Sequence, residues 1–379
     1  MSRKNLIVGQ SGGPTAVINS SLYGVVKEGL CQKEKIAHVY GMVNGIEGFL
    51  NGTVLDFEEA LPGDELEYLK TTPGAYLGSC RYKLPEDLED AVYPKLFQKF
   101  EELEIGYFFY IGGNDSMDTV SKLSRYAKKV GSDIRVIGVP KTIDNDVACT
   151  EITFGYNTAV SVAAEALDRL HTTADTHHRI MVLEVMGRYA GWIALESAIA
   201  GGADVALIPE IPYDINKAAQ KILNRKKRGK EFSIVVVAEG AKPIGGDISI
   251  KNIRSKGNGV DNIKLGGAGE RVAEELQKLT GLEARCTVLG YMQRGGTPTA
   301  FDRVLSTKYG AKAMELALQE KFNVLTVIKD GRLDYVPLED VVGNNKKMGA
   351  ASGNTPESNI RRVNLDNDLV KTARHIGIN

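Results

Sequence analysis

The chain has 379 residues, a formal net charge of −1, 43% hydrophobic residues and 25% charged residues. This length and ordinary globular composition predict two lobes or one large α/β unit and argue against a disordered chain. The near-zero charge gives no general attraction to nucleic acid or to anionic membranes, so we expect neither as a partner.

Short β-branched apolar runs alternate along the chain with longer segments of helical periodicity. The predicted strands are residues 6–8, 107–111, 134–139, 180–185, 205–208, 234–237 and 287–289. The segments with helical periodicity include residues 160–170, 215–226, 270–279 and 303–318. This alternation predicts parallel βαβ units, and therefore an α/β fold of two Rossmann-like, doubly wound lobes with mostly parallel sheets and a cleft between them. Ligands bind at the carboxyl ends of such strands, so the loops there are the place to look for function.

The first predicted strand ends in the sequence GQSGGPT at residues 9–15, just before a helix. Glycines at a strand–helix turn let backbone amides approach a phosphate, and the helix N-terminus adds positive potential. The loop matches neither GxxxxGK[ST] nor GxGxxG, which argues against a P-loop and against a dinucleotide-binding fold. A merely tight turn remains an alternative.

The strand at residues 107–111 ends in GGNDS, again at the start of a helix. Asp115 and Ser116 would fit simple helix capping. A second glycine-rich loop beside the first favours a phosphate and metal site.

The strand at residues 134–139 runs into the sequence PKTIDND at residues 140–146. Asp144 and Asp146 beside Lys141 are costly to bury without cations or substrate donors. Phosphoryl transfer uses such a set: one carboxylate accepts the proton of the attacking hydroxyl, another holds Mg²⁺, and a lysine offsets charge on the phosphoryl oxygens. A solvated acidic turn is the alternative.

Several arginines lie near predicted strand ends in a chain of near-zero charge. They are Arg81, Arg179, Arg188, Arg285 and Arg294. Each alone is more often a surface residue, but together they indicate contacts to anions.

Cysteine usage and hydropathy predict the compartment. The four cysteines are scattered and show no CxxC spacing, which argues against a disulfide framework or a zinc site. No stretch approaches the roughly 20 apolar residues of a membrane span, and the apolar run at residues 6–8 is too short for a signal peptide. We expect a cytoplasmic protein.

Taken in chain order, these motifs resemble those of the phosphofructokinase family. The resemblance covers roughly residues 5–310 through SGG, LGSxR, GGxDS, PxTIDND, MGR, PE and GxxQRGG. It implies Mg²⁺-dependent transfer of a phosphoryl group, in glycolysis, to the 1-hydroxyl of fructose 6-phosphate, giving fructose 1,6-bisphosphate. We expect a donor lobe from residues 1–155 with about 293–340, and a sugar-phosphate lobe from residues 156–292 with the C-terminal tail.

The resemblance also implies roles for residues of the first lobe. Asp144 matches the catalytic base, and Thr142 matches the residue beside the transferring phosphoryl group, where it also contacts substrate. Asp146 matches a residue that organises the metal. Gly13 and Arg81 match contacts to the donor phosphates.

The sugar-phosphate pocket is implied in the same way. Its matching residues are Arg179, Met186, Gly187, Arg188, Glu210, Arg285, Tyr291 and Arg294. In the family, the residues matched by Arg179 and Arg285 typically reach in from a neighbouring subunit. We therefore expect a homodimer or homotetramer with shared active sites.

Two positions discriminate between phosphoryl donors. ATP-dependent members typically read GGDGS and PGTIDND, whereas pyrophosphate-dependent members read GGDDS and PKTIDND, and this chain has Asp115 and Lys141 in place of both glycines. A carboxylate at Asp115 would repel an α-phosphate, and Lys141 would supply positive charge to pyrophosphate, so we include both in the catalytic set. Tyr291 replaces a histidine common in ATP-dependent members. We expect pyrophosphate as the donor.

The metal site departs from the family pattern. Asn114 stands where an aspartate associated with Mg²⁺ is usual, although its carbonyl oxygen can still ligate. The alternatives to the pyrophosphate reaction are an ATP-dependent 6-phosphofructokinase that tolerates Asp115 and Lys141, and a non-catalytic sugar-phosphate sensor on the same fold. A further acceptor, such as sedoheptulose 7-phosphate, is compatible with the sequence.

Overall fold

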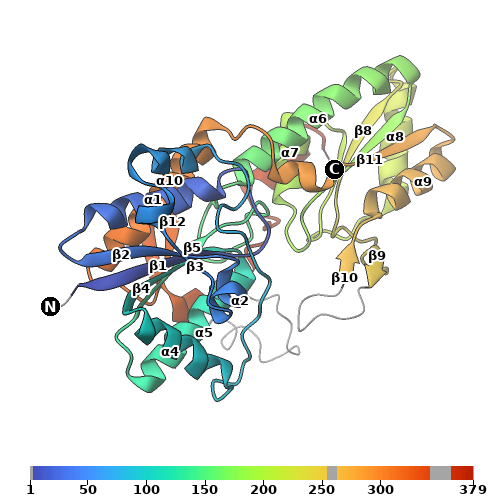
Figure 1. Cartoon of the computed structure of the whole chain (residues 1–379). Helices are drawn as coiled ribbons and strands as arrows, with labels where there is room; N and C mark the ends of the chain where they lie inside the picture. Colours follow the sequence, from blue (N-terminus) through green and yellow to red (C-terminus); the bar gives the residue numbers. More distant parts are fainter. Residues whose placement is uncertain (1–2, 254–262, 342–359, 379) are drawn as a thin grey trace.

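The computed structural model describes residues 3–253, 263–341 and 360–378 of the chain. Two mostly parallel sheets with helices on both faces form two lobes that lie side by side (Figure 1). The predicted α/β fold of two doubly wound lobes is confirmed. The division into a donor lobe and a sugar-phosphate lobe stays a prediction.

The first lobe is built on a seven-stranded sheet in the order β13-β12-β5-β4-β1-β2-β3. Its strands are β1 (Lys4–Gln10), β2 (Ile36–Met42), β3 (Val54–Asp56), β4 (Ile105–Gly112), β5 (Arg135–Pro140), β12 (Val324–Lys329) and β13 (Arg332–Pro337). The inner pairings are parallel, and the two outer pairings, β2 with β3 and β12 with β13, are antiparallel. Every residue of β4 is buried, as expected for a strand covered by helices on both faces.

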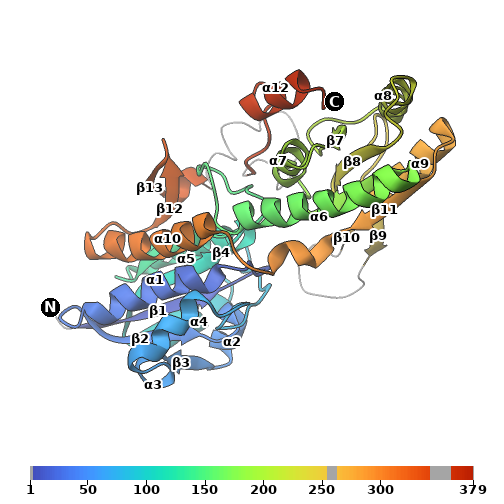
Figure 2. The same cartoon turned by 90° about the horizontal axis from the view of Figure 1, so that it is seen from above.

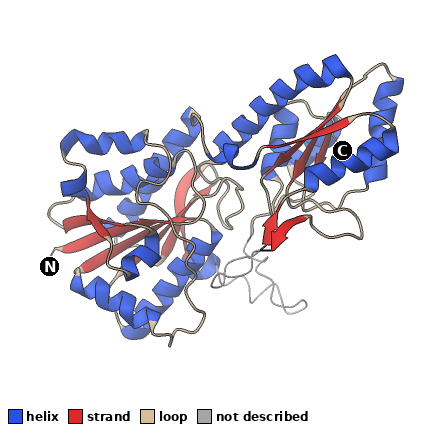
Figure 3. Cartoon of the chain, turned by 45° about the vertical axis from the view of Figure 1, so that its right-hand side comes forward, coloured by secondary structure: helices blue, strands red, loops and turns tan. Residues whose placement is uncertain are grey.

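Helices cover both faces of this sheet (Figures 2 and 3). One face carries α1 (Ile18–Cys31) and α10 (Ala300–Leu318), and the other carries α4 (Val92–Glu102) and α5 (Asn114–Val130). Between β2 and β4 the chain also forms α2 (Gly45–Leu50), α3 (Phe57–Ala60) and the 3₁₀ helix η1 (Gly63–Lys70). Alternate residues of β1 enter the two cores, with Leu6 on the α1–α10 side and Ile7 on the α4–α5 side.

Glycines bring α1 and α10 into close contact. A Cβ atom on Gly24 would lie 2.5 Å from the carbonyl oxygen of Thr307, and one on Gly310 would lie 2.0 Å from that of Ser21. A larger residue at either position would force the helices apart. The close approach fixes α10, which arrives from the far end of the sequence, onto the first lobe.

The second lobe is built on a four-stranded parallel sheet in the order β11-β6-β8-β7. Its strands are β6 (Ile180–Val185), β7 (Val205–Leu207), β8 (Ser233–Ala238) and β11 (Ala284–Val288). One face carries α6 (Tyr156–His177) and α7 (Trp192–Ala200), and the other carries α8 (Ile215–Lys227) and α9 (Ala268–Thr280). A small antiparallel pair, β9 (Ile250–Ile253) with β10 (Ile263–Leu265), lies beside this lobe (Figure 1).

The chain crosses between the lobes more than once. The 3₁₀ helix η2 (Gly290–Arg294) follows β11, and α10 then returns to the first lobe. Buried Asp302 of α10 accepts hydrogen bonds from the backbone N–H groups of Gly155 (3.0 Å) and Thr158 (2.6 Å) at the start of α6. A carboxylate at a helix N-terminus is favourable, so this contact ties the lobes together.

The last described segment also contacts both lobes. Ile360 forms an isolated bridge with Val147 of the first lobe, and α12 (Asp368–His375) packs against α7 of the second. Among the helices of the described ranges, none has the length and apolar character needed to cross a bilayer.

Candidate active site

Three strand-end loops meet at one edge of the first sheet. The N–H of Ser11, after β1, donates to the carbonyl of Ile111 at the end of β4 (2.9 Å). The N–H of Lys141, after β5, donates to the carbonyl of Gly112 (2.8 Å). Because β1, β4 and β5 are parallel neighbours, their following loops lie side by side, as the sequence predicts.

The loop that carries Asp144 and Asp146 is held by its own backbone contacts. Asn145 has φ 53°, a left-handed conformation that asparagine tolerates better than most residues, and its Oδ1 accepts from the N–H of Thr153 (3.0 Å). The Thr153 hydroxyl donates to the carbonyl of Thr142 (2.7 Å), and the N–H of Asp144 donates to the Thr142 hydroxyl (3.1 Å). Thr142 therefore shapes the loop as well as lying within it.

The two carboxylates of this loop are buried and incompletely satisfied. Oδ1 of Asp144 and Oδ1 of Asp146 have no hydrogen-bond partner within the described part of the chain. Burial raises the pKa of Asp144 above its usual range. Burial and the neighbouring Asp144 raise the pKa of Asp146 to about 7, which hydrogen bonds from Thr142 and Asn114 partly oppose.

Such unpaired buried carboxylate oxygens fit a divalent cation. Carboxylate and amide oxygens are preferred Mg²⁺ ligands, and a bound cation would remove the penalty of leaving them unsatisfied. Asn114, the first residue of α5, lies beside Asp146 and can add its carbonyl oxygen. The structure thus brings together Asn114 and Asp146, which the sequence predicts for the metal site, and places the predicted base Asp144 beside them.

Lys141 lies between the acidic loop and the first glycine-rich loop. It is buried, and its Nζ donates to the carbonyl oxygen of Gly13. Burial lowers the pKa of Lys141 to about 7, with a further contribution from Arg294, while Asp144 acts in the opposite direction. The Lys141 side chain can therefore gain or lose its positive charge near neutral pH, beside the two carboxylates.

Arg294 reaches the same point from η2. A Cβ atom on Gly13 would lie 2.8 Å from the guanidinium carbon of Arg294, so a side chain at this position would displace the guanidinium. Arg294 also lies over the ring of Tyr291 (5.7 Å) and lowers the pKa of Asp144. The predicted donor residue Gly13 and the predicted sugar residue Arg294 are therefore neighbours.

Arg81 belongs to a loop that is bound to the glycine-rich turn. The N–H of Gly12 donates to the carbonyl of Cys80 (3.1 Å), and the Ser79 hydroxyl donates to the carbonyl of Gly12 (2.6 Å). Arg81 is close enough to contribute to the lowered pKa of Lys141. The structure thus places three cationic side chains around Gly13.

Asp115 lies at the outer edge of the group. Its side chain is 71% exposed, in the first turn of α5, and pairs with Nζ of Lys83 (3.1 Å). It faces the surface instead of the buried carboxylates.

The predicted sugar residues after β6 lie in a turn that contacts η2 and the segment after β8. The N–H of Met186 donates to Oε1 of buried Gln293 (3.2 Å), which links this turn to η2. Gly187 has φ 135°, and its carbonyl accepts from the N–H of Gly240 (3.2 Å). Arg188 stacks on the ring of Tyr189 (5.1 Å).

Glu239 is a site residue that sequence reasoning missed. It directly follows β8, and its N–H donates to the carbonyl of Val185 (2.9 Å). Burial, the charge of Asp144 and the charge of Glu184 raise the pKa of Glu239 to about 7. Its proximity to Asp144 makes it a candidate contact for the acceptor. The rule that functional residues follow the ends of parallel strands would have identified Glu239, because residues 234–237 were predicted as a strand.

Glu210, by contrast, is engaged by the backbone. Its carboxylate accepts from the N–H of Gly191 (3.0 and 3.1 Å) and from the N–H of Val363 (2.8 Å). These bonds fix the start of α7 and the last described segment, which gives Glu210 a positioning task. Its predicted contact with substrate stays a prediction.

Arg179 and Arg285 lie at the other end of the second sheet. Both pair with Glu283, Arg179 through Nε at 2.8 Å. They flank the starts of β6 and β11, whereas Met186 follows the end of β6, a separation of about 20 Å along the strand. Within one chain they are not part of the site.

Comparison with known proteins gives a consistent set of relatives. The model of the family described as Phosphofructokinase matches residues 5–317. The "ATP-dependent 6-phosphofructokinase 2" of Clostridium perfringens is 49% identical over 71% of this chain and 67% of its own length. The "ATP-dependent 6-phosphofructokinase" of Chloroflexus aurantiacus is 40% identical over 97% of this chain and 95% of its own.

Solved structures share the fold. A pyrophosphate-dependent phosphofructokinase from Nitrosospira multiformis superposes with a TM-score of 0.79 at 31% identity, covering 89% of this chain and 84% of its own. Another, from Marinobacter aquaeolei, gives 0.77 at 28% identity, covering 99% and 92%. The names of these relatives thus differ in the phosphoryl donor.

Proposed function

Because the chain belongs to the phosphofructokinase family, we propose that it transfers a phosphoryl group from pyrophosphate to the 1-hydroxyl of fructose 6-phosphate. The products are fructose 1,6-bisphosphate and phosphate, and the reaction is reversible. The observation that carries this proposal is the buried cluster in which Lys141 and Arg294 face the unsatisfied carboxylates of Asp144 and Asp146.

The chemistry assigned to Asp144 follows from its surroundings. The oxygen of the 1-hydroxyl bonds to the phosphorus of the donor while the bond from phosphorus to the leaving phosphate breaks. The hydroxyl proton passes to the Asp144 carboxylate. Burial raises the pKa of this carboxyl, which makes its ionised form a better acceptor for that proton.

Cationic side chains stabilise the charge of the phosphoryl group during transfer. Lys141, Arg294 and Arg81 gather around Gly13, where they can contact the donor and the transferring oxygens. Asp146 and Asn114, with Asp144, would hold Mg²⁺, which would supply further positive charge to the phosphate oxygens. We assign the donor to the lobe of the seven-stranded sheet and the sugar phosphate to the turns after β6 and β8.

Two features support pyrophosphate as the donor. Lys141 places a buried cation beside Gly13, which suits a donor that has no nucleoside to add binding contacts. The Lys83–Asp115 pair lies at the first turn of α5, where we expect a third phosphate and a nucleoside to extend. The competing candidate is an ATP-dependent enzyme, which the names of the relatives from C. perfringens and C. aurantiacus favour.

A donor comparison tests the assignment. Fructose 1,6-bisphosphate formation is measured with pyrophosphate and with ATP for the wild type and for Asp115→Gly/Lys141→Gly. We expect the wild type to use pyrophosphate and the double variant to gain activity with ATP. Asp115→Asn removes the charge at nearly constant size, which separates repulsion from steric exclusion. A wild type active with ATP alone would overturn the donor assignment.

We also propose a homo-oligomer with shared sites. Arg179 and Arg285 lie too far from Met186 to act in their own chain, so their predicted role requires a partner subunit. Apolar side chains beside Arg294 are exposed in the single chain, with Tyr291 69% and Met292 70% accessible. Such exposed apolar groups next to a catalytic arginine suit a subunit contact.

A further inference from the structure

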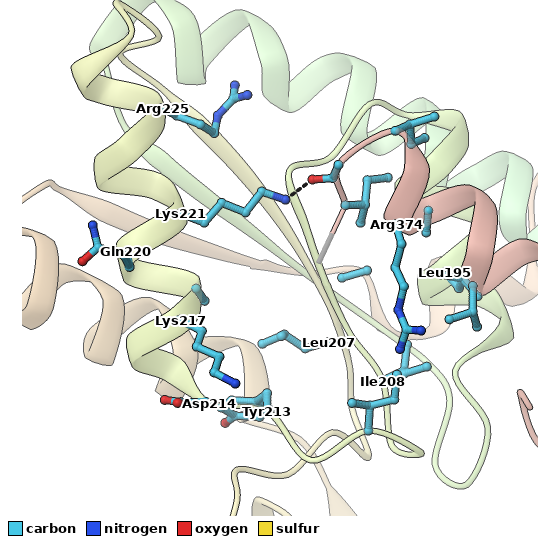
Figure 4. A pocket seen from close by; sticks show the side chains of 18 of the residues that line it. Leu195, Leu207, Ile208, Tyr213, Asp214, Lys217, Gln220, Lys221, Arg225 and Arg374 are labelled. Atoms are coloured by element: carbon cyan, nitrogen blue, oxygen red, sulfur yellow. Dashed lines mark hydrogen bonds between the residues drawn. The ribbon is translucent and has the colours of Figure 1, made fainter. Parts of the chain in front are cut away.

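The second lobe contains a cavity of about 1030 Å³ between α8, α12 and the edge strand β7 (Figure 4). Its volume is in the range that holds small organic ligands. Among the described residues that line it, none belongs to the group around Asp144. The proposed phosphoryl-transfer reaction therefore does not use this cavity.

Apolar side chains form the floor and one wall of the cavity. Leu207 and Ile208 lie at the floor in Figure 4, and Leu195 of α7 lies beside them. Val370 and Ala373 of α12 complete the apolar wall. A ligand that fills this space must present an apolar body to these groups.

Cationic side chains dominate the polar part of the lining. They are Lys217, Lys221, Arg225, Arg228, Lys230 and Arg374, and the acidic residue among the lining residues is Asp214. Asp214 is occupied as the N-cap of α8, where its Oδ1 accepts from the N–H of Asn216 (3.0 Å).

Several of these cations already have protein partners. Nζ of Lys221 donates to the carbonyl oxygens of Asp204 and Gly377. Arg225 pairs with Asp204 (2.7 Å). These two side chains support the wall of the cavity and leave little capacity for a ligand.

Lys217 and Arg374 are different. The side chain of neither residue makes a hydrogen bond or an ion pair within the described ranges. Figure 4 shows Lys217 extending from α8 and Arg374 from α12 into the space between the two helices, with Arg374 above Ile208. Both side chains are exposed, so each can reach an anion that enters the cavity while its aliphatic stem lies against apolar surface.

We propose that this cavity binds an anionic amphiphile, a small molecule with a carboxylate, sulfonate or phosphate group on an apolar body. The anionic group would be held by Lys217 or Arg374 or both, since each side chain can donate charge-assisted hydrogen bonds to anionic oxygens. The apolar body would lie on Leu207 and Ile208 against α12. Both parts are needed, because the charges alone would bind simple inorganic ions and the floor alone would bind neutral molecules.

The test uses 8-anilinonaphthalene-1-sulfonate, an anionic amphiphile whose fluorescence rises in apolar surroundings. We expect one binding site per wild-type chain, with displacement of the probe by decanoate. Neither decanol nor inorganic phosphate at the same concentration should displace it. Lys217→Gln/Arg374→Gln should weaken probe binding at least tenfold, about the effect of losing 1.4 kcal/mol of interaction.

The matched control is Lys226→Gln/Lys227→Gln, which removes the same charge from exposed positions of α8 outside the cavity. It should bind the probe as the wild type does, and both double variants should keep the wild-type near-ultraviolet circular dichroism. An absence of probe binding would overturn the proposal, as would equal weakening in the control. Displacement by decanol as effective as by decanoate, or displacement by phosphate alone, would also overturn it.

Discussion

Lys141 and Asp144 belong to one short loop and carry opposite charges, yet burial shifts both toward their neutral forms. Burial lowers the pKa of the lysine to about 7 and raises that of the aspartate. Burial thus disfavours the charged forms of both side chains, and a bound cation or phosphate would favour the ionised form of the side chain that it contacts. The loop therefore favours the binding of charged ligands.

Replacing Asp144 tests its role as the base. Asp144→Asn keeps the size and the hydrogen bond from the N–H of residue 144 to Thr142, but it cannot accept the hydroxyl proton. We expect the turnover number to fall about 10²- to 10⁴-fold, the usual contribution of a general base. Fructose 6-phosphate affinity, measured by calorimetry, should change only a few fold. The exposed Asp168→Asn on α6 is the control, and wild-type turnover in Asp144→Asn would contradict the assigned role.

The lowered pKa of Lys141 predicts proton uptake on donor binding. The folded-state pKa of about 7 lies below the ordinary value of about 10.4, so near pH 8 the free protein holds Lys141 largely neutral. Bound pyrophosphate favours the ammonium, so binding should take up protons and weaken as the pH rises above about 7. Calorimetry in two buffers of different ionisation enthalpy, with a chelator present, measures the uptake.

Lys141→Met supplies the comparison for this measurement. Without the ammonium, proton uptake near pH 8 should disappear and the pH dependence of affinity should flatten. Equal uptake in wild type and variant would assign the titration to another group.

Most of the site could be predicted from the sequence because one physical rule governs it. Loops after parallel strands carry Gly13, Asn114, Asp144 and Met186, and the structure places them as that rule requires. Contacts between residues far apart in the sequence could not be predicted in this way. The pairing of Arg294 with Gly13 joins residues far apart in the chain, and periodicity carries no signal for it.

At the scale of elements, an irregular segment of residues 77–90 organises the part of the site that we assign to the donor. It contains neither helix nor strand, but its backbone binds the glycine-rich turn through Cys80, and Lys83 pairs with Asp115. Nearly buried Lys122 of α5 donates to the carbonyl of Leu84 (3.0 Å) and pairs with Glu86 (2.5 Å). We call residues 77–90 the donor strap.

Removing the Lys122 ammonium should loosen the donor strap. In Lys122→Met the carbonyl of Leu84 loses its donor, and Asp118, paired with Lys122 at 2.6 Å, loses its counter-ion. We expect a loss of about 1–3 kcal/mol in the free energy of unfolding, measured by urea titration, and a higher KM for the donor. Lys128→Met on an exposed turn of the same helix is the control. An unchanged urea midpoint would show that the strap is held by other contacts.

Some strands were predicted from the sequence, and others were not. The buried parallel strands β4, β5, β6 and β8 were found, because continuous β-branched runs mark strands covered on both faces. The antiparallel edge strands β3 and β13 were missed, because they are half-exposed and lack such runs. β12 was also missed, although its sequence VLTVIK carries the signal. Helix α6 extends to both sides of the predicted residues 160–170, because Asp302 supports its start.

At the scale of the whole molecule, a complete site draws on both lobes and, in our proposal, on a second chain. Arg294 enters from the segment that connects the lobes, and Glu239 enters from the second sheet. Arg179 and Arg285 are distant from both. An isolated subunit would therefore hold the base without all of the predicted contacts to the sugar phosphate.

Mixing inactive variants tests the shared site. Asp144→Asn removes the base, and Arg179→Ala/Arg285→Ala removes the contacts assigned to a partner subunit. If the site is shared, a mixed oligomer contains some sites with neither defect, and activity should reappear after unfolding and refolding the two variants together. Each variant refolded alone is the control. A mixture no more active than its parts would contradict a shared site.

The first lobe combines segments that are far apart in the sequence, and this affects the order in which the two sheets can form during synthesis on the ribosome. The four strands of the second sheet are complete once Val288 has been made, whereas the first sheet must wait for β12 at Val324–Lys329. Until α10 emerges, the face of α1 around Gly24 has no helix to cover it. The second sheet can thus form before the first, although its α6–α7 face still lacks α12, and the nascent first lobe presents apolar surface to chaperones in the meantime.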